Sequence, residues 1–169
     1  GTGKQFSHNV AVTSLSGLAF LAGGHTPGRG RYGSQVSRTV DMLIESARPS
    51  GYIINEPHVS HGPMYGHGFA TLFLAEVHGM ETRTRVRAKL RNVLSRSVAL
   101  IVRSQNDEGG WRYQPVPSDA DISVTICEVI VSSDTFSVTS SGDGSALCKS
   151  YMSSTVGGAS PMVSANTAA

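Results

Sequence analysis

The stretch SRSVALIVRSQNDEGGW, residues 95–111, decides the fold, because it joins an apolar helical pattern to a glycine-rich turn that ends in an aromatic residue. The stretch SRTVDMLIESARPSGY, residues 37–52, has the same order of features 58 residues earlier. A second pair precedes these two: Ala19-Phe20-Leu21-Ala22 recurs as Leu72-Phe73-Leu74-Ala75, a shift of 53 residues. Self-similarity at such spacings is typical of helical repeats. We therefore predict a repeating unit of helix, loop, helix and turn.

Apolar residues between these turns recur at three- and four-residue spacings, which is the period of an amphipathic helix. The spacing predicts helices near residues 10–22, 35–47, 65–78, 84–104 and 119–131. One helical hairpin of this size cannot bury its apolar stripe alone, so neighbouring hairpins must stack side by side. We therefore expect an all-α fold of stacked helical hairpins, curved or closed into a ring.

The composition changes along the chain. Over all 169 residues, hydrophobic residues make up 39% and charged residues 15%, both below the usual proportions. From residue 132 to 169, Ser, Thr, Gly and Ala dominate. A segment of this composition buries too little apolar surface to offset the entropy lost when it becomes ordered. We predict a repeat domain over residues 1–131 and an irregular, disordered tail over 132–169. The net charge of +2 is too small to imply nucleic acid as a partner of the whole chain.

One turn carries a family resemblance. Gln105 with Gly109-Gly110-Trp111 resembles the Gln-Trp repeat of the squalene-hopene and oxidosqualene cyclases and their prenyltransferase relatives. The segment Ser-Asp-Ala-Asp-Ile-Ser-Val-Thr at residues 118–125 is similar to the Asp-x-Asp-Asp-Thr helix start of the cyclases, and residues 64–71 are similar to the openings of their inner helices. The resemblance covers about residues 10–131. It implies a partial α/α toroid, in which inner and outer helices alternate around a cavity that, in the cyclases, folds a long polyprene.

The same resemblance implies two catalytic residues, Asp121 and Asp119. Asp121 matches the position of the acid that protonates an alkene or epoxide, and Asp119 would be its neighbour. A desolvated carboxyl group close to another one has a raised pKa, as a proton donor requires. The fourth position of the motif holds Ile122 where the cyclases have a further Asp. The alternative is structural, because Asp119 stands where it would cap the helix and Asp121 stands in the first turn, where a negative charge is favoured.

Five aromatic residues are candidates for a substrate-binding wall that stabilises carbocations: Tyr65, Phe69, Phe73, Trp111 and Tyr113. For Trp111 the structural alternative is a clasp between adjacent hairpins, which we favour because a buried Trp more often packs than binds. The glycines before it let the chain leave a helix through backbone angles closed to other residues.

Three further patterns in the sequence give weaker indications of a functional site. Gly28-x-Gly30-x-x-Gly33 has the spacing of a dinucleotide fingerprint but lacks the preceding strand, so we interpret it as a connector between helices. His58, His61 and His67 lie close together in a loop without a nearby Cys ligand, so we predict no metal site and no cofactor. Residues 83–103 hold seven basic residues and no acid. That face could meet anionic lipid, diphosphate or RNA, although a solvated helix face is the commoner explanation.

We expect a terpene cyclase-like domain, with acid-initiated cyclisation of a polyprenyl or triterpene hydrocarbon as the activity that the resemblance implies. The alternative is a non-catalytic α/α-toroid module for binding or scaffolding. An incomplete ring exposes apolar helix surface at its open edge, so we also expect self-association or low solubility. Peripheral membrane contact is a further expectation, because the basic face of residues 83–103 could meet anionic lipid. A partial ring cannot exclude water from a carbocation, so this segment alone should be inactive. The sequence does not indicate a localisation. No apolar run is long enough to span a bilayer, and no signal-peptide pattern is present.

Overall fold

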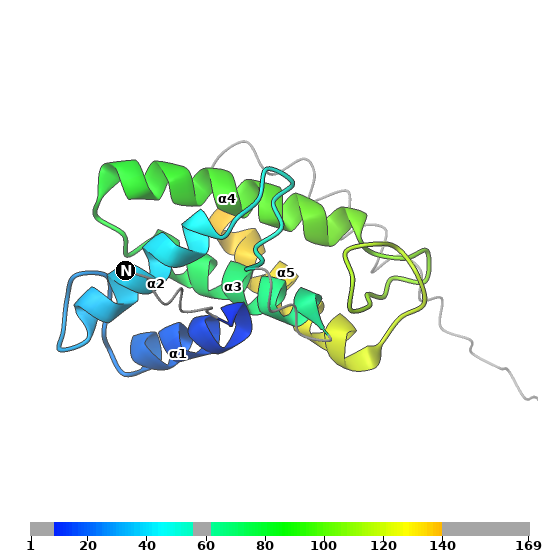
Figure 1. Ribbon diagram of the computed structural model, residues 1–169, viewed down its shortest axis with the longest axis horizontal. Helices are drawn as coiled ribbons and strands as arrows, with labels where there is room; N and C mark the ends of the chain where they lie inside the picture. The colour runs from blue at the N-terminus through cyan, green and yellow to red at the C-terminus, as the bar shows by residue number, and fades with distance from the viewer. Residues whose placement is uncertain (1–8, 56–61, 140–169) are drawn as a thin grey trace, which may run out of the picture.

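The computed structural model describes residues 9–55 and 62–139, and this part of the chain is helical, without a β-strand (Figure 1). It contains five helices: α1 (Val10–Ala22), α2 (Gly33–Glu45), α3 (Pro63–His78), α4 (Thr84–Arg103) and α5 (Ile122–Thr139). The predicted all-α class is confirmed. The first four predicted helices agree with the observed ones to within two residues at each end.

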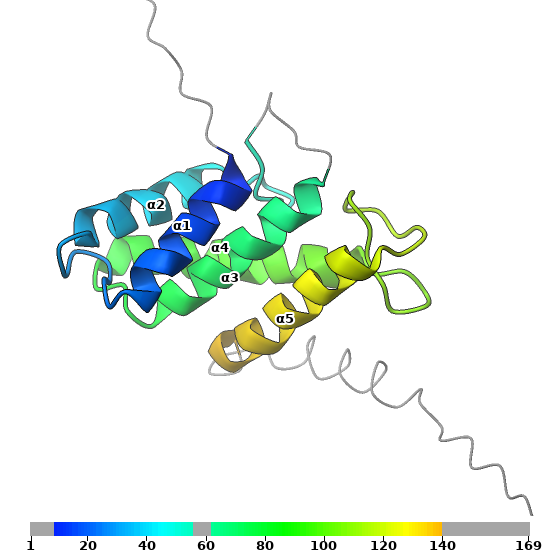
Figure 2. The same ribbon diagram turned by 90° about the horizontal axis from the view of Figure 1, so that it is seen from below.

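The helices lie in two layers. Figure 2 shows α1, α3 and α5 side by side and running in the same direction, with α2 and α4 on one side of this row and running the opposite way. Contacts join α1 to α3 and α3 to α5 within the row, and each hairpin joins one helix of the row to one of the second layer. The predicted stacking of helical hairpins is therefore present, as two hairpins followed by α5. We call α1, α3 and α5 the inner row.

Helix α3 is the centre of the packing, and it is apolar on most of its sides, as a helix enclosed by neighbours should be. Two glycines allow its neighbours to approach. A Cβ atom at Gly66 would lie 3.6 Å from the Cβ of Val10 on α1, and one at Gly68 would lie 2.9 Å from Oε1 of Glu128 on α5. Gly68 in particular leaves no room for a side chain, so the distance between α3 and α5 depends on it.

Two apolar clusters hold the layers together. The first joins the first four helices, and its fully enclosed members include Val36, Val40 and Leu43 of α2. The second joins α3, the end of α4, the following turn and α5 through Met64, Ile101, Trp111, Val124 and Val131, with Leu100 completing it. The second cluster is therefore what attaches α5 to the rest of the fold.

The turns that follow α2 and α4 each pack onto a neighbouring helix. Gly51 has φ +91°, and a Cβ atom there would lie 2.2 Å from the carbonyl oxygen of Arg96 on α4. The Ser97 hydroxyl donates a hydrogen bond of 2.9 Å to the Gly51 carbonyl oxygen. Gly109 has φ +86° in the second turn. The left-handed conformation explains why both turns contain glycine, and at Gly51 the close approach to Arg96 requires it as well.

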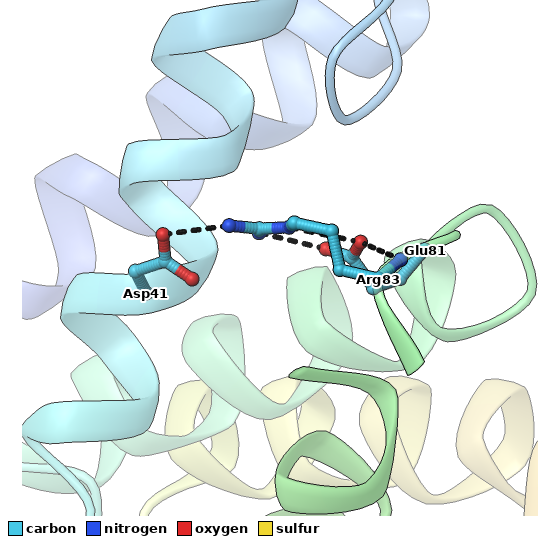
Figure 3. Close-up of polar contacts among 3 residues, drawn as sticks. All are labelled: Asp41, Glu81 and Arg83. Atoms are coloured by element: carbon cyan, nitrogen blue, oxygen red, sulfur yellow. Dashed lines mark hydrogen bonds and ion pairs between the residues drawn. The ribbon is translucent and has the colours of Figure 1, made fainter. Parts of the chain in front are cut away.

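An ion-pair cluster fixes the loop between α3 and α4 to α2 (Figure 3). The Arg83 guanidinium donates 2.8 Å to Oε2 of Glu81 and 2.9 Å to Oδ2 of Asp41. The Glu81 side chain is 1% exposed. Because its carboxylate accepts hydrogen bonds from Arg83, the pKa of Glu81 is lowered. Arg83 thus joins the second hairpin to the first.

Helix α5 runs eight residues beyond the predicted boundary at residue 131, because it ends at Thr139. Ser and Thr cost a helix only a few tenths of a kcal/mol each, so a change in composition did not end it. Residues 140–169 of the predicted tail lie outside the described residues. Within the described parts of the chain, no helix combines the length and the apolarity needed to cross a membrane.

Candidate functional site

Asp121 begins α5 as its N-terminal cap. Its Oδ1 atom accepts hydrogen bonds from the backbone N–H groups of Ser123 at 3.0 Å and Val124 at 3.2 Å, and from the Ser123 hydroxyl at 2.5 Å. Its carbonyl oxygen accepts the first helical bond, from Thr125 N at 2.9 Å. These bonds satisfy backbone donors that the first turn of a helix leaves without partners. Both carboxylates were predicted to serve the helix start, with Asp119 as the cap, but α5 begins at Ile122 and the cap is Asp121.

The electrostatics agree with this geometry. The hydrogen bond from Ser123 and then the one from the Val124 backbone lower the pKa of Asp121 to about 2. A carboxyl group with that pKa is ionised at neutral pH, whereas a general acid must carry its proton. In this arrangement Asp121 can accept hydrogen bonds and attract cations, but it does not hold a proton to donate.

Two predicted wall residues meet at the same place. The Tyr113 hydroxyl donates 3.1 Å to Oδ2 of Asp121, and the Tyr65 hydroxyl is hydrogen-bonded to the Ser123 hydroxyl. The two tyrosine rings are 6.3 Å apart between centroids. Tyr65, Tyr113, Asp121 and Ser123 thus form one polar cluster, which we call the α5 cap cluster. Ser123 was not among the predicted residues, although its position two residues after an N-cap Asp could have indicated it.

Asp119 does not join the α5 cap cluster. Its side chain is 73% exposed and pairs with Arg112, whose guanidinium also lies over the Tyr113 ring at 5.3 Å from the centroid. The two carboxylates of the motif therefore have different partners. The raised pKa expected for two neighbouring carboxylates is therefore not found at Asp121. Hydrogen bonds lower its pKa instead.

Trp111 is a clasp. It is 1% exposed, its indole N–H donates 2.8 Å to the carbonyl oxygen of Ile101 on α4, and its backbone N–H donates 3.0 Å to the Thr125 hydroxyl on α5. Asn106 closes the turn before it, since its Oδ1 accepts from Gly110 N at 2.7 Å. The ring packs within the second apolar cluster. The favoured structural interpretation of Trp111 agrees with these contacts.

The two phenylalanines on α3 differ. Phe73 is fully buried and touches α1 so closely that a Cβ atom at Gly17 would lie 2.6 Å from its ring. Phe69 is half-buried. Of these two, only Phe69 has surface left for a ligand. Among the five predicted wall residues, Phe73 and Trp111 are part of the core.

The structure describes the glycine connector between α1 and α2 and one of the three clustered histidines, His67. Gly28 and Gly30 have φ +72° and +83° in the turn between α1 and α2, which agrees with the connector interpretation. His67 is buried in α3, where its Nδ1 accepts 3.2 Å from Ile53 N and its Nε2 donates 3.3 Å to the Ser97 carbonyl oxygen. Burial lowers its pKa to about 4. His67 is thus a neutral core residue, whereas His58 and His61 lie outside the described residues.

Glu128 is a buried acid that the sequence analysis did not predict. Glu128 on α5 has no exposed surface, and burial raises its pKa to about 8. Next to it, burial raises the pKa of the Cys127 thiol to about 12. Both side chains face Gly68 of α3, with a Cβ atom there 2.9 Å from Glu128 Oε1 and 3.1 Å from Cys127 Sγ. The only signal in the sequence is a single acid inside the otherwise apolar run ICEVIV, residues 126–131.

The inner row exposes apolar surface. A hollow of about 350 Å³ lies between α1 and α3, and it is lined by Leu18, Leu21, Ala22, Leu72, Glu76 and Met80. Large apolar side chains are also exposed on α1 and α5: Val12, Leu15, Ile122, Ile126, Val129 and Ile130. The four on α5 follow helical spacing and so share one side of the helix. Both outermost helices of the row therefore present apolar faces.

In the residues that the structure describes, no group of three or more His, Cys, Asp and Glu side chains could hold a metal ion. A scan of protein-family models found no match to the chain, and searches among curated proteins and among solved structures found no match either.

Proposed function

We propose that the chain is a segment of an α/α repeat domain whose inner row binds a long apolar ligand, such as a polyprenyl hydrocarbon, without catalysing its cyclisation. The observation that carries this proposal is the apolar hollow between α1 and α3, which Leu18, Leu21, Leu72 and Met80 line. A concave apolar surface gains about 25 cal/mol for each Å² that a hydrocarbon covers. The alternating inner and outer helices support the part of the proposal that places this surface on the inside of a partial toroid.

Acid-initiated cyclisation, which the resemblance implies, is the second candidate. The α5 cap cluster favours it in one respect, because Tyr65 and Tyr113 bring two aromatic rings to Asp121. The ionised state of Asp121 argues against it, since a pKa of about 2 leaves no proton to transfer at neutral pH. Asp121 therefore fits a helix cap better than a proton donor, and it does not line the apolar hollow.

Self-association is part of the same proposal. Ile122 is 78% exposed, and Ile126, Val129 and Ile130 continue the same side of α5. Exposed apolar side chains that are contiguous on one helix are typical of surfaces that another helix covers. Size-exclusion chromatography should give a species larger than a monomer, and Ile126→Lys should shift it towards the monomer. A monomer at all concentrations would contradict this part.

Binding is tested with squalene as the probe. Radiolabelled squalene should bind saturably, and the pair Leu18→Gln with Met80→Gln should weaken binding at least about tenfold, because two apolar contacts of more than 1 kcal/mol are lost. Val116→Gln is the control, since Val116 is 59% exposed and does not line the hollow. Equal binding by the control and the paired variant, or no saturable binding, would contradict the proposal.

The same incubations separate the two candidates. Gas chromatography of the extracted squalene should show no cyclic product, and Asp121→Asn should leave squalene binding unchanged. Cyclic products that disappear in Asp121→Asn would instead favour the cyclase hypothesis.

A further inference from the structure

The basic residues of α4 do not all have the same surroundings. Between residues 83 and 103 there is no acidic residue. Arg83, which directly precedes α4, forms ion pairs with Glu81 and Asp41 (Figure 3). Further along the helix, Arg103 donates 2.5 Å to the carbonyl oxygen of Ser50. Within the described residues, Arg87 and Arg91 make no side-chain hydrogen bond or ion pair.

Arg87 and Arg91 line the same hollow. It measures about 540 Å³ and lies where the end of α3 faces the first two turns of α4. Its lining residues are His78, Gly79, Thr84, Arg87, Ala88 and Arg91. The four on α4 are spaced by three and four residues, so they share one side of the helix and their side chains are neighbours. Arg85 and Lys89, on the same helix, do not line the hollow.

The hollow has a positive potential that nothing within its lining offsets, because no acidic residue lines it. His78 responds to it: burial and then the charges of Arg91 and Arg87 lower its pKa. Two acids lie near His78 along the chain: Glu81 is already paired with Arg83, and Glu76 lines the other hollow, between α1 and α3. The first-turn N–H groups of α4 add a partial positive charge on the Thr84 side. Two guanidinium groups, an imidazole and a hydroxyl are therefore arranged around one concave space.

We propose that this hollow binds a phosphate-bearing ligand, with Arg87 and Arg91 holding the phosphate oxygens and His78 and Thr84 completing the contacts. Guanidinium groups bind phosphate through paired, charge-assisted hydrogen bonds, which gives them an advantage over other cations at such sites. Thr84 can donate from its hydroxyl, and His78 donates from its ring. This inference is independent of the apolar hollow, which Leu18, Leu21 and Met80 line on another part of the inner row.

Inorganic pyrophosphate is the first probe, with binding measured by isothermal titration calorimetry at low salt. Arg87→Gln and Arg91→Gln should each weaken binding at least about tenfold. Arg85→Gln is the matched control, because it removes the same charge from the same helix but not from the hollow. A loss in Arg85→Gln equal to that in Arg87→Gln would show a diffuse charge effect and overturn the proposal.

His78 gives a second readout. Bound pyrophosphate should raise the pKa of His78, because the anion stabilises the imidazolium, and binding should tighten as the pH falls through that pKa. The His78 ring signal in NMR titrations, assigned with His78→Gln, reports this shift. A pKa of His78 that pyrophosphate leaves unchanged would contradict its place in the site.

Vesicles distinguish a free phosphate from a lipid headgroup. Cosedimentation with phosphatidylcholine vesicles that contain phosphatidic acid, reversed by pyrophosphate and lost in Arg87→Gln, would identify the headgroup as the source. Pyrophosphate binding without vesicle binding would identify a soluble phosphate compound. Failure of both probes to bind would overturn the proposal and would leave the squalene experiment unaffected.

Discussion

Glu128 should make the stability of the protein fall as the pH rises, and Glu128→Gln should remove this dependence. The pKa of Glu128 is raised from 4.5 to about 8 by burial. Between these two values the unfolded chain releases a proton that the folded chain keeps. The free energy of unfolding therefore decreases with pH, by about 1.4 kcal/mol per unit for this one group. Its contribution is complete below pH 4.5 and is lost as the pH rises to about 8.

The magnitude at neutral pH follows from the same values. From pH 4.5 to pH 7, Glu128 should cost about 3 kcal/mol of stability relative to a group that does not titrate. His67 acts in the opposite direction, because burial lowers its pKa from 6.5 to about 4, so that its contribution is lost as the pH falls. The two effects oppose each other between pH 4.5 and 6.5. For this reason the difference between variant and wild type is the informative quantity.

Urea unfolding at half-unit steps from pH 4.5 to 8 measures that difference. The free energy of unfolding of Glu128→Gln, relative to the wild type, should increase by about 1.4 kcal/mol per pH unit. The substitution keeps the shape of the side chain and removes its ionisation. Glu76→Gln is the control, since it makes the same substitution at an exposed position on α3. A flat difference for Glu128→Gln would show that the group is not buried as a neutral acid, and the reasoning would fail.

Three further substitutions test the Gly51 turn, the Trp111 contacts and the packing of α3 against α5. Gly51→Ala should destabilise the protein by more than the roughly 1–2 kcal/mol of a left-handed backbone, because its Cβ atom would lie 2.2 Å from the Arg96 carbonyl oxygen. Gly24→Ala, with φ +81° and nothing within 4 Å, is its matched control in chemical denaturation, and equal losses would refute the close approach. Trp111→Phe should cost about 1–3 kcal/mol through the lost indole hydrogen bond, and an unchanged midpoint in urea would contradict the clasp. Gly68→Ala should separate α3 from α5 and lower the thermal midpoint, and a higher midpoint would mean that the helix-propensity gain of Ala prevails.

The helices could be predicted from the sequence because local periodicity encodes them. Val36, Val40 and Leu43 recur at the helical spacing and are all fully buried. The glycine-rich turns were also predictable, since Gly51 and Gly109 occupy backbone conformations with positive φ. The C-terminal boundary of α5 was not, because Ser-rich composition weakens a helix without ending it.

The site was predictable only in part. Tyr65, Tyr113 and Asp121 come together as a cluster, but the state of the carboxyl group depends on hydrogen bonds from Ser123 and Val124 that only the fold supplies. The same holds for Glu128, whose burial depends on Gly68 of another helix. A residue's identity suggests what it can do, whereas its partners in space set its pKa.

The pKa of Asp121 tests the central claim most directly, because a helix cap and a proton donor need opposite values. Carbon-13 NMR of the Asp side-chain carboxyl groups across the acid range, with Asp121 assigned from Asp121→Asn, measures it. The helix-cap role of Asp121 predicts a midpoint of about 2, and a midpoint above the ordinary Asp value of about 4 would contradict it in favour of an acid held ready to protonate a substrate.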